Sequence, residues 1–117
     1  MNFMSRTQRA VYMLIAIAQG GDCCTPLHSI EGTSISHKEG MAAQLRRAGI
    51  IKSYRGPNGG YRLAQDPKEI TIGEIHDVVE PDKGFLFGKD QKADGAFERA
   101  KEEALATLDT ITLASCL

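Results

Sequence analysis

A glycine-rich stretch at residues 55–60, RGPNGG, lies between two short strand-like segments in a chain that is otherwise helical in pattern. Glycine and asparagine adopt the positive φ angles that tight turns require, and proline fixes φ near about −65°. The pattern predicts a β-hairpin with strands at 50–54 and 61–64 and a tip at 56–60. A two-residue hairpin needs only Asn-Gly, so this longer tip with an arginine on each arm indicates more than a chain reversal.

Helical periodicity describes most of the remaining sequence. Within the segment 5–19, apolar side chains recur at i, i+3, i+4 and i+7. The expected buried stripe is Val11, Leu14, Ile15 and Ala18. Longer helices are also predicted over 34–48, 72–80 and 96–117, with a short helical turn near 26–30 that Thr25 caps.

The order of these elements is helix, short helix, helix, hairpin, helix, loop and long helix, which is the plan of a winged helix-turn-helix domain. The expected fold class is mainly α with a small β-hairpin: a winged helix DNA-binding domain over 1–80, a loop over 81–95 and a dimerisation helix over 96–117. One small domain does not need so long a helix for its own core, so pairing in a dimer is favoured over packing within the chain. The candidate interface residues are Phe97, Ala104, Leu105, Leu108 and Ile111.

The net charge of −1 hides an asymmetry along the chain. Residues 1–65 contain eight Lys or Arg and three Asp or Glu, which gives +5, whereas residues 66–117 contain six and twelve, which gives −6. A basic half can dock on a polyanion while the acidic half points away from it. Chance clustering of charge is the alternative.

Several classes of protein do not fit the sequence. The longest apolar stretch, 10–18, is too short for a membrane span, and the first residues do not form a signal peptide, so a cytoplasmic protein is expected. Three cysteines do not make a disulfide framework, because two of them are adjacent and such pairs are strained. The three histidines are scattered and no nucleophile motif is present, so an enzyme is not expected.

The wing motif and the residues before it resemble the Rrf-two (Rrf2) family of winged-helix regulators, the type that senses iron–sulfur clusters or nitric oxide. The resemblance is carried by LRRAG at 45–49, by RGPNGGYRL at 55–63 and by ITIGEI at 70–75, with weaker likeness at both ends of the chain. It implies a homodimeric DNA-binding transcription factor, usually a repressor, that binds a palindromic operator. It also implies that members without a cluster respond to a small molecule or to a partner protein.

The same resemblance assigns roles to residues of this sequence. Ser34 falls at the cap of the recognition helix, where free N–H groups can hold a phosphate, and a carboxylate at Glu39 can accept from a cytosine amino group. Arg46 and Arg47 are expected near phosphates, and Arg55 in the minor groove. The complete predicted DNA-binding set is Ser34, His37, Glu39, Gln44, Arg46, Arg47, Arg55, Gly56, Pro57, Gly59, Gly60 and Arg62.

One departure from the family concerns the helix-turn-helix. The segment after Leu27 is about three residues shorter than the family norm, which removes most of a helical turn at about 3.6 residues per turn. Lys38 falls where a leucine is usual, and Gly40 costs the recognition helix about 1 kcal/mol relative to alanine. The alternative function is therefore a winged-helix protein with weakened DNA binding that acts through protein–protein contacts.

A second departure concerns the sensor. Residues 81–95 contain no cysteine and no histidine, so the family's iron–sulfur cluster, which needs thiolate or imidazole ligands, is not expected. Cys23, Cys24 and His28 have only a weak metal-site spacing, so no metal is predicted and ordinary loop roles are favoured. Cys116 is expected to be a free thiol or an interface residue, and His76 a satisfied surface histidine.

Overall fold

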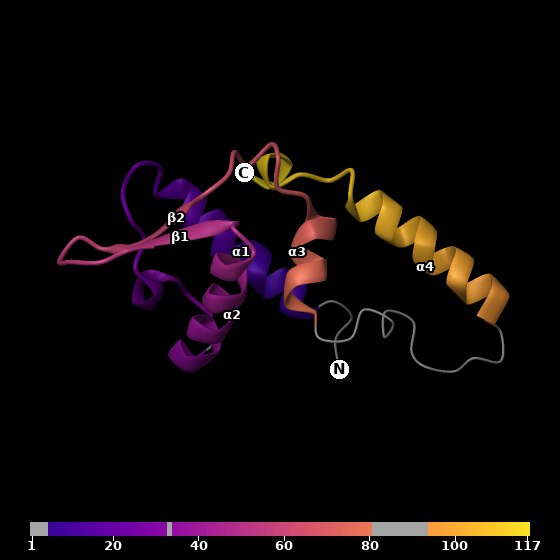
Figure 1. Ribbon diagram of the computed structural model, residues 1–117, viewed down its shortest axis with the longest axis horizontal. Helices are drawn as coiled ribbons and strands as arrows, with labels where there is room; N and C mark the ends of the chain where they lie inside the picture. Colours follow the sequence, from indigo (N-terminus) through magenta and orange to yellow (C-terminus); the bar gives the residue numbers. More distant parts are fainter. Residues whose placement is uncertain (1–4, 33, 81–93) are drawn as a thin grey trace.

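The computed structural model describes residues 5–32, 34–80 and 94–117, with the side chains of 94–98 and 101 excepted (Figure 1). It is mainly helical and contains one antiparallel two-stranded sheet, as predicted. The elements in chain order are α1 (Ser5–Gln19), η1 (Leu27–Ser29), α2 (Ile35–Arg47), β1 (Ile51–Tyr54), β2 (Gly60–Leu63), α3 (Ile72–Val79), α4 (Asp94–Leu108) and η3 (Leu113–Cys116).

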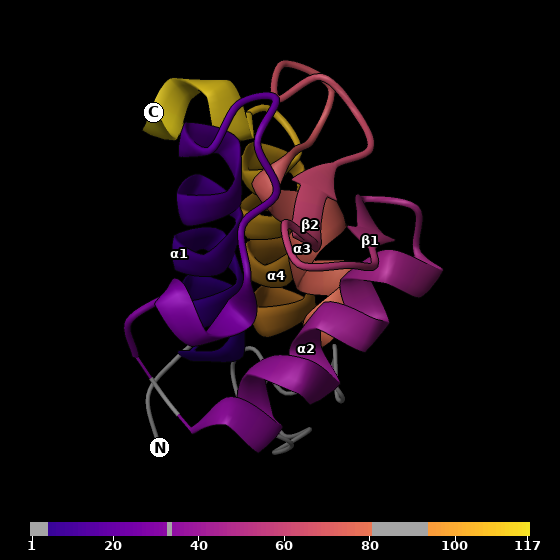
Figure 2. The same ribbon diagram turned by 90° about the vertical axis from the view of Figure 1, so that its left-hand side faces the viewer.

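Helix α1 contacts α3, β2 and η3, and Figure 2 shows η3 beside one end of it. Its buried stripe was predicted one residue too late. The buried apolar residues of α1 are Ala10, Met13, Leu14 and Ile17. Val11, Ile15 and Ala18 are only half-buried. The two stripes have the same spacing and lie side by side, so periodicity alone does not choose between them when a helix is covered from several directions.

Helices α2 and α3 and the hairpin complete the core. Met41 and Leu45 face inward from α2, and Ile75 and Val79 face inward from α3. The start of β1 adds Ile51 to the same cluster, which makes the base of the hairpin part of the core. Burying side chains of this size contributes about 1.5–3 kcal/mol each, so α2 and the hairpin are held firmly at their inner ends.

The predicted capping of α2 is confirmed. The Ser34 side chain accepts from the backbone N–H of His37, and Gly49 follows the helix with φ +79°. The cap of η1 differs from the prediction, because the extended residue before the turn is Pro26 and it makes no side-chain cap. Thr25 forms an antiparallel bridge with Tyr61 of β2 instead. The turn is only three residues long, in agreement with the shortened segment of the sequence.

The hairpin pairs Ile51 with Leu63 at its base and Tyr54 with Gly60 at its outer end. Its tip is 55–59 rather than 56–60, because Gly60 pairs as part of β2. The hairpin extends away from the helices, and the tip is the part of it farthest from α3 (Figure 1).

The last helix is shorter than predicted and ends at Leu108 rather than continuing to 117. The following segment returns to the start of α3, where the Ile72 N–H donates to the Ile111 carbonyl and the Leu113 N–H donates to the Ile70 carbonyl. Leu113 is fully buried in the core. The periodicity of 109–117 therefore reflects a segment anchored beside α3, and not a continued helix. Residues 81–93 of the predicted loop and the Phe97 side chain lie outside the described residues.

Two helix ends meet where α1 begins and α3 finishes. The Glu80 carboxylate accepts from the Thr7 N–H at 3.1 Å and from the Thr7 hydroxyl at 2.9 Å, so a negative charge lies at the start of α1. Arg6 donates to the Val79 carbonyl at 2.8 Å, so a positive charge lies at the end of α3. Both placements are favourable for the helix dipoles.

The prediction of a surface position for His76 is wrong. Its side chain is 2% exposed, and Nδ1 lies 3.3 Å from the Thr7 hydroxyl. Its neighbours Ile75 and Val79 share the side of α3 that packs on α1, and the imidazole is enclosed at that contact.

None of the helices in the described ranges is both long enough and apolar enough to cross a membrane.

Candidate nucleic-acid interface

The outer face of α2 presents several of the predicted contact residues to solvent. Ser34 and Glu39 are exposed in its first half, and Arg46 and Arg47 are exposed in its last turn. Two cations at that position also favour the helix, because they lie at the negative end of its dipole. Side chains in this position are able to contact a polyanion without first breaking contacts within the protein.

The hairpin tip supplies a third exposed arginine. Arg55, Gly56 and Pro57 are all exposed, and Gly56 has φ +110° with open space where a Cβ would stand. Among the residues that the structure describes, no carboxylate forms an ion pair with Arg46, Arg47 or Arg55.

The helix α2 and the hairpin are neighbours in sequence and in space. Helix α2 leads through a tight turn into β1 and packs against it. In Figure 1 the hairpin extends away from α4, whereas α2 runs downward from the base of the hairpin. We refer to the three exposed arginines together, Arg46 and Arg47 in the last turn of α2 and Arg55 at the outer end of the hairpin, as the basic end.

Arg62 differs from these three arginines because it is already engaged. Its guanidinium lies 3.4 Å from the Asp22 carboxylate and 5.4 Å from the centre of the Tyr54 ring. Only 35% of its side chain is exposed, whereas the Asp22 side chain is fully exposed. An exposed pair of this kind stabilises a fold by only about 0–1 kcal/mol, and it links the loop before η1 to the hairpin.

Gln44 was predicted to contact DNA, and the structure places it in a network between helices. It accepts from Arg6 at 3.1 Å and donates to the Val78 carbonyl at 3.4 Å. This half-buried side chain joins α1, α2 and α3. Any contact of Gln44 with DNA requires at least one of these hydrogen bonds to be given up.

Gly59 and Gly60 have structural reasons to be glycine. A Cβ on Gly59 would lie 2.3 Å from the Tyr54 carbonyl oxygen. A Cβ on Gly60 would lie 2.6 Å from the carbonyl carbon of Thr25, and Gly60 also has φ +144°. These two residues allow the strand to approach neighbouring backbone closely.

Lys38 is a structural residue whose role sequence analysis missed. Its side chain is 8% exposed, and its ammonium donates to the carbonyl of Ile30, with the Leu27 carbonyl 3.5 Å away. It therefore supplies a donor to the Ile30 carbonyl at the end of the short turn η1, whereas the Leu27 carbonyl already accepts from the Ile30 N–H. The only signal in the sequence was a charged residue on the inward face of α2.

Comparison with known proteins identifies the family. A model of the Rrf2 family, described as iron-dependent transcriptional regulators, matches residues 3–117. The chain belongs to the Rrf2 family. The matched family is one of transcriptional regulators and not of enzymes, in agreement with the prediction.

Curated relatives and solved structures agree with this assignment. The IscR regulator of Photobacterium profundum is 36% identical over 68% of this chain and 49% of its own length. The IscR regulator of Klebsiella pneumoniae is 32% identical over 97% of this chain and 77% of its own length. The structure of T. potens IscR superposes with a TM-score of 0.80 at 34% identity, covering 97% of this chain and 84% of that one. The structure of the global cysteine regulator CymR of B. subtilis superposes with a TM-score of 0.78 at 28% identity. This match covers 97% of this chain and 94% of that one. The chain spans about half the length of the curated relatives that match first.

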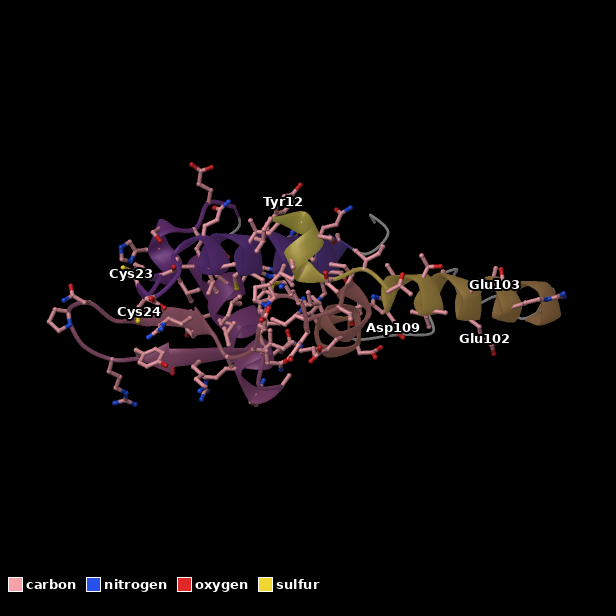
Figure 3. The ribbon with its side chains drawn as sticks, turned by 90° about the horizontal axis from the view of Figure 1, so that it is seen from above. Tyr12, Cys23, Cys24, Glu102, Glu103 and Asp109 are labelled. Carbon is pink, nitrogen blue, oxygen red and sulfur yellow. The ribbon has the colours of Figure 1, made fainter. Side chains whose placement is uncertain are left out.

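The donor groups present do not fit an iron–sulfur cluster. Cys23 and Cys24 lie in the loop beside the hairpin (Figure 3), and Cys116 lies in η3. No three His, Cys, Asp or Glu side chains of the described ranges gather as a metal site, and the sequence of 81–93 contains neither cysteine nor histidine.

Proposed function

We propose that this protein is a DNA-binding transcriptional regulator, a repressor that binds a palindromic operator as a homodimer. The observation that supports the proposal most is the basic end, where Arg46, Arg47 and Arg55 are exposed from two neighbouring elements. Membership of the Rrf2 family and similarity to IscR regulators support the same function.

The geometry favours the docking mode of other winged helix-turn-helix domains. Helix α2 would enter the major groove with Ser34 and Glu39 leading, while its last turn supplies cations to the phosphate backbone. The slim tip around Gly56 would reach the adjacent minor groove with Arg55. His37, Gly59, Gly60 and Arg62 remain candidates in this arrangement, although the two glycines and Arg62 also have roles within the fold.

Helix α4 supports the dimer part of the proposal. Ala104, Leu105 and Leu108 are only half-buried, and Ile111, just after the helix, is 38% exposed. The radius of gyration is 15.4 Å, whereas a compact chain of this length has about 13 Å, because α4 projects from the rest of the molecule (Figure 1). A second copy that packs along α4 would cover this apolar surface.

The salt dependence of DNA binding tests the proposal. Affinity for a DNA duplex should fall linearly on a log–log plot, with a slope of about −0.9 for each phosphate neutralised. Changing Arg46, Arg47 and Arg55 together to Gln removes up to six cations from a dimer and should make the slope shallower by up to about five. Lys68→Gln removes an exposed cation away from the basic end and is the matched control. Selection of bound genomic fragments then reports the half-site spacing of a palindrome.

A second function is favoured by one observation. The turn η1 is a single three-residue turn, and Gln44 is engaged inside the protein, so the helix-turn-helix is reduced compared with the usual plan. The second candidate is a winged-helix protein that binds DNA weakly and acts through protein contacts. Absence of any DNA shift at low salt, or a flat salt dependence, would favour this candidate over the first.

The proposal includes the absence of an iron–sulfur cluster, because cysteine and histidine are missing from 81–95. The purified protein should be colourless even when it is produced anaerobically. A brown protein with visible absorbance would overturn this part of the proposal.

A further inference from the structure

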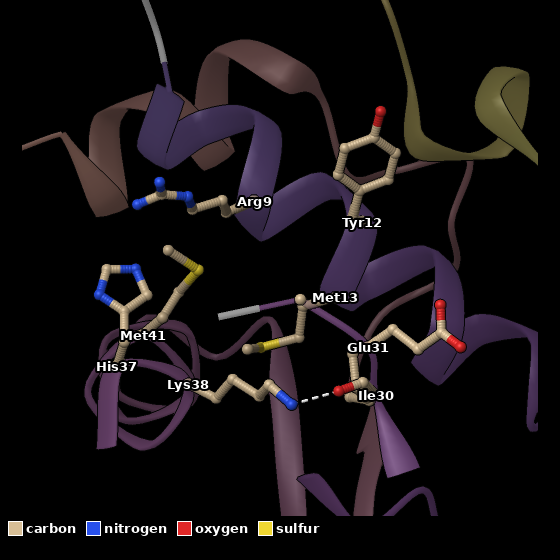
Figure 4. Close-up of a pocket in the computed structure, with 9 residues that line it drawn as sticks. Arg9, Tyr12, Met13, Ile30, Glu31, His37, Lys38 and Met41 are labelled. Atoms are coloured by element: carbon tan, nitrogen blue, oxygen red, sulfur yellow. Dashed lines mark hydrogen bonds between the residues drawn. The ribbon is translucent and has the colours of Figure 1, made fainter. Parts of the chain in front are cut away.

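A cleft separates α1 from the first turns of α2 (Figure 4). Its floor is formed by three buried apolar side chains, Met13 of α1, Ile30 after η1 and Met41 of α2. The cleft is open to solvent on one side and has a volume of about 50 Å³. One water needs roughly 10–15 Å³ on this measure, so a short aliphatic group fits the cleft.

One edge of this cleft contains two nitrogen-bearing side chains that face the same space. Figure 4 shows the imidazole of His37 and the guanidinium of Arg9 at the same side of the cleft, with the end of the Met41 side chain beside them. His37 Nε2 is buried, yet it has no hydrogen-bond partner among the described residues. A buried unpaired polar atom costs about 1–3 kcal/mol, so a group that satisfies it is favoured.

The other charged groups at the cleft define how a ligand would be oriented. Lys38 is occupied by the Ile30 carbonyl, so its ammonium is already engaged within the protein. Glu31 lies on the opposite rim from Arg9 and His37 (Figure 4) and would repel an anion there. An anionic group is therefore favoured only at the edge formed by Arg9 and His37.

We propose that this cleft binds a small aliphatic monocarboxylate of about four to six carbons in total. The carboxylate accepts from Arg9 and from His37 Nε2–H, and the tail covers Met13 and Met41. Charge-assisted hydrogen bonds of this kind are stronger than neutral ones. The cleft is then a ligand site that lies directly against the recognition helix.

Occupancy of the cleft has a consequence that rests on the proposed function. His37 lies in the first turn of α2, the end predicted to enter the major groove, and the same imidazole faces the cleft. A carboxylate that holds His37 withdraws it from a base or a phosphate. The ligand and DNA should therefore oppose one another, and each should weaken the binding of the other by the same factor.

The ligand site is tested without DNA. Sodium butyrate, valerate and hexanoate are titrated at constant ionic strength, and the NMR signals of the Met13 and Met41 methyl groups and of the His37 ring are followed. The matching neutral amides are the ligand control. Shifts with the acids but not with the amides are expected, and Arg9→Gln should weaken binding by about tenfold or more.

Matched variants keep this test specific. Arg9 is exposed, so its loss does not threaten folding, and Arg99→Gln on α4 removes an equally exposed arginine far from the cleft. Binding should survive in Arg99→Gln and recover in part in Arg9→Lys. The proposal is overturned when the acids cause no shifts, when the amides act equally well, or when Arg9→Gln binds as the parent does.

DNA binding is measured separately by fluorescence anisotropy in the same buffers. Weaker binding with the acids than with the amides is expected, and equal binding would overturn the proposed opposition. Loss of all DNA binding with intact ligand shifts would refute the proposed function but not the ligand site. Normal DNA binding without ligand shifts would refute the ligand site alone.

Discussion

Replacement of Gly60 by alanine should destabilise the fold strongly, although the residue was first selected as a DNA contact. The added Cβ would lie 2.6 Å from the Thr25 carbonyl carbon and 2.7 Å from the Pro26 nitrogen. Both are backbone atoms, so a side-chain rotation cannot relieve the clash. Gly60 also has φ +144°, which side-chain-bearing residues rarely adopt.

The expected loss of stability follows from the backbone hydrogen bonds that the added Cβ must break. Thr25 and Tyr61 exchange two backbone hydrogen bonds of 2.9 Å each, and the Cβ forces these two segments apart. Two such bonds contribute about 2 kcal/mol together, and the backbone strain adds about 1–2 kcal/mol. We therefore expect Gly60→Ala to lower the free energy of unfolding by about 3–4 kcal/mol.

Gly56→Ala is the matched control, because Gly56 also has positive φ but nothing lies within 4 Å of the added Cβ. Gly56→Ala should lower the free energy of unfolding only by the backbone strain, about 1–2 kcal/mol. Urea unfolding of both variants at one protein concentration measures the difference, since dimer stability depends on concentration. Equal losses of stability for the two variants would refute the argument, because they would show that the close approach of Gly60 to Thr25 contributes nothing to the cost of the substitution.

Three further predictions concern stability and are measured by thermal or urea unfolding. Gly40→Ala should stabilise the protein by about 1 kcal/mol, because the added Cβ meets nothing within 4 Å; no gain would contradict a cost of glycine in α2. Leu113→Ala should cost about 3 kcal/mol if 109–117 is anchored in the core, and a loss below about 1 kcal/mol would argue against that anchoring. Glu80→Gln should cost about 0.5–1 kcal/mol through the dipole of α1, whereas the control Asp77→Asn, which removes a negative charge from the last turn of α3, should cost nothing; equal losses would exclude that role.

Local signals in the sequence predicted most of the elements. The caps at Ser34 and Thr71 mark the starts of α2 and α3, and glycine-rich stretches mark the end of α1 and the hairpin tip. The buried face of α1 was predicted wrongly because two neighbouring stripes of that helix are both apolar. The end of α4 was missed because the backbone pairing of 111–113 with 70–72 joins segments that are distant in sequence.

The predicted contact residues divide in the structure according to what else they touch. Arg46, Arg47 and Arg55 are exposed, as residues for an external partner should be. Gln44 and Arg62 have partners within the protein, which a linear motif does not reveal because those partners lie on other elements. A motif therefore indicates where contacts with DNA occur in a family, and the fold decides which of these side chains are available.

The shortened turn before α2 does not leave the recognition helix without support. Met41, Ala42 and Leu45 are each at most 1% exposed, so the inner face of α2 is fully packed. At the outer end Lys38 donates to the Ile30 carbonyl, which a leucine in the same place is unable to do. Lys38 thus supplies a donor to a carbonyl group at the end of the three-residue turn η1. A recognition helix fixed in this way is compatible with DNA binding, and it makes the salt dependence of that binding the decisive measurement.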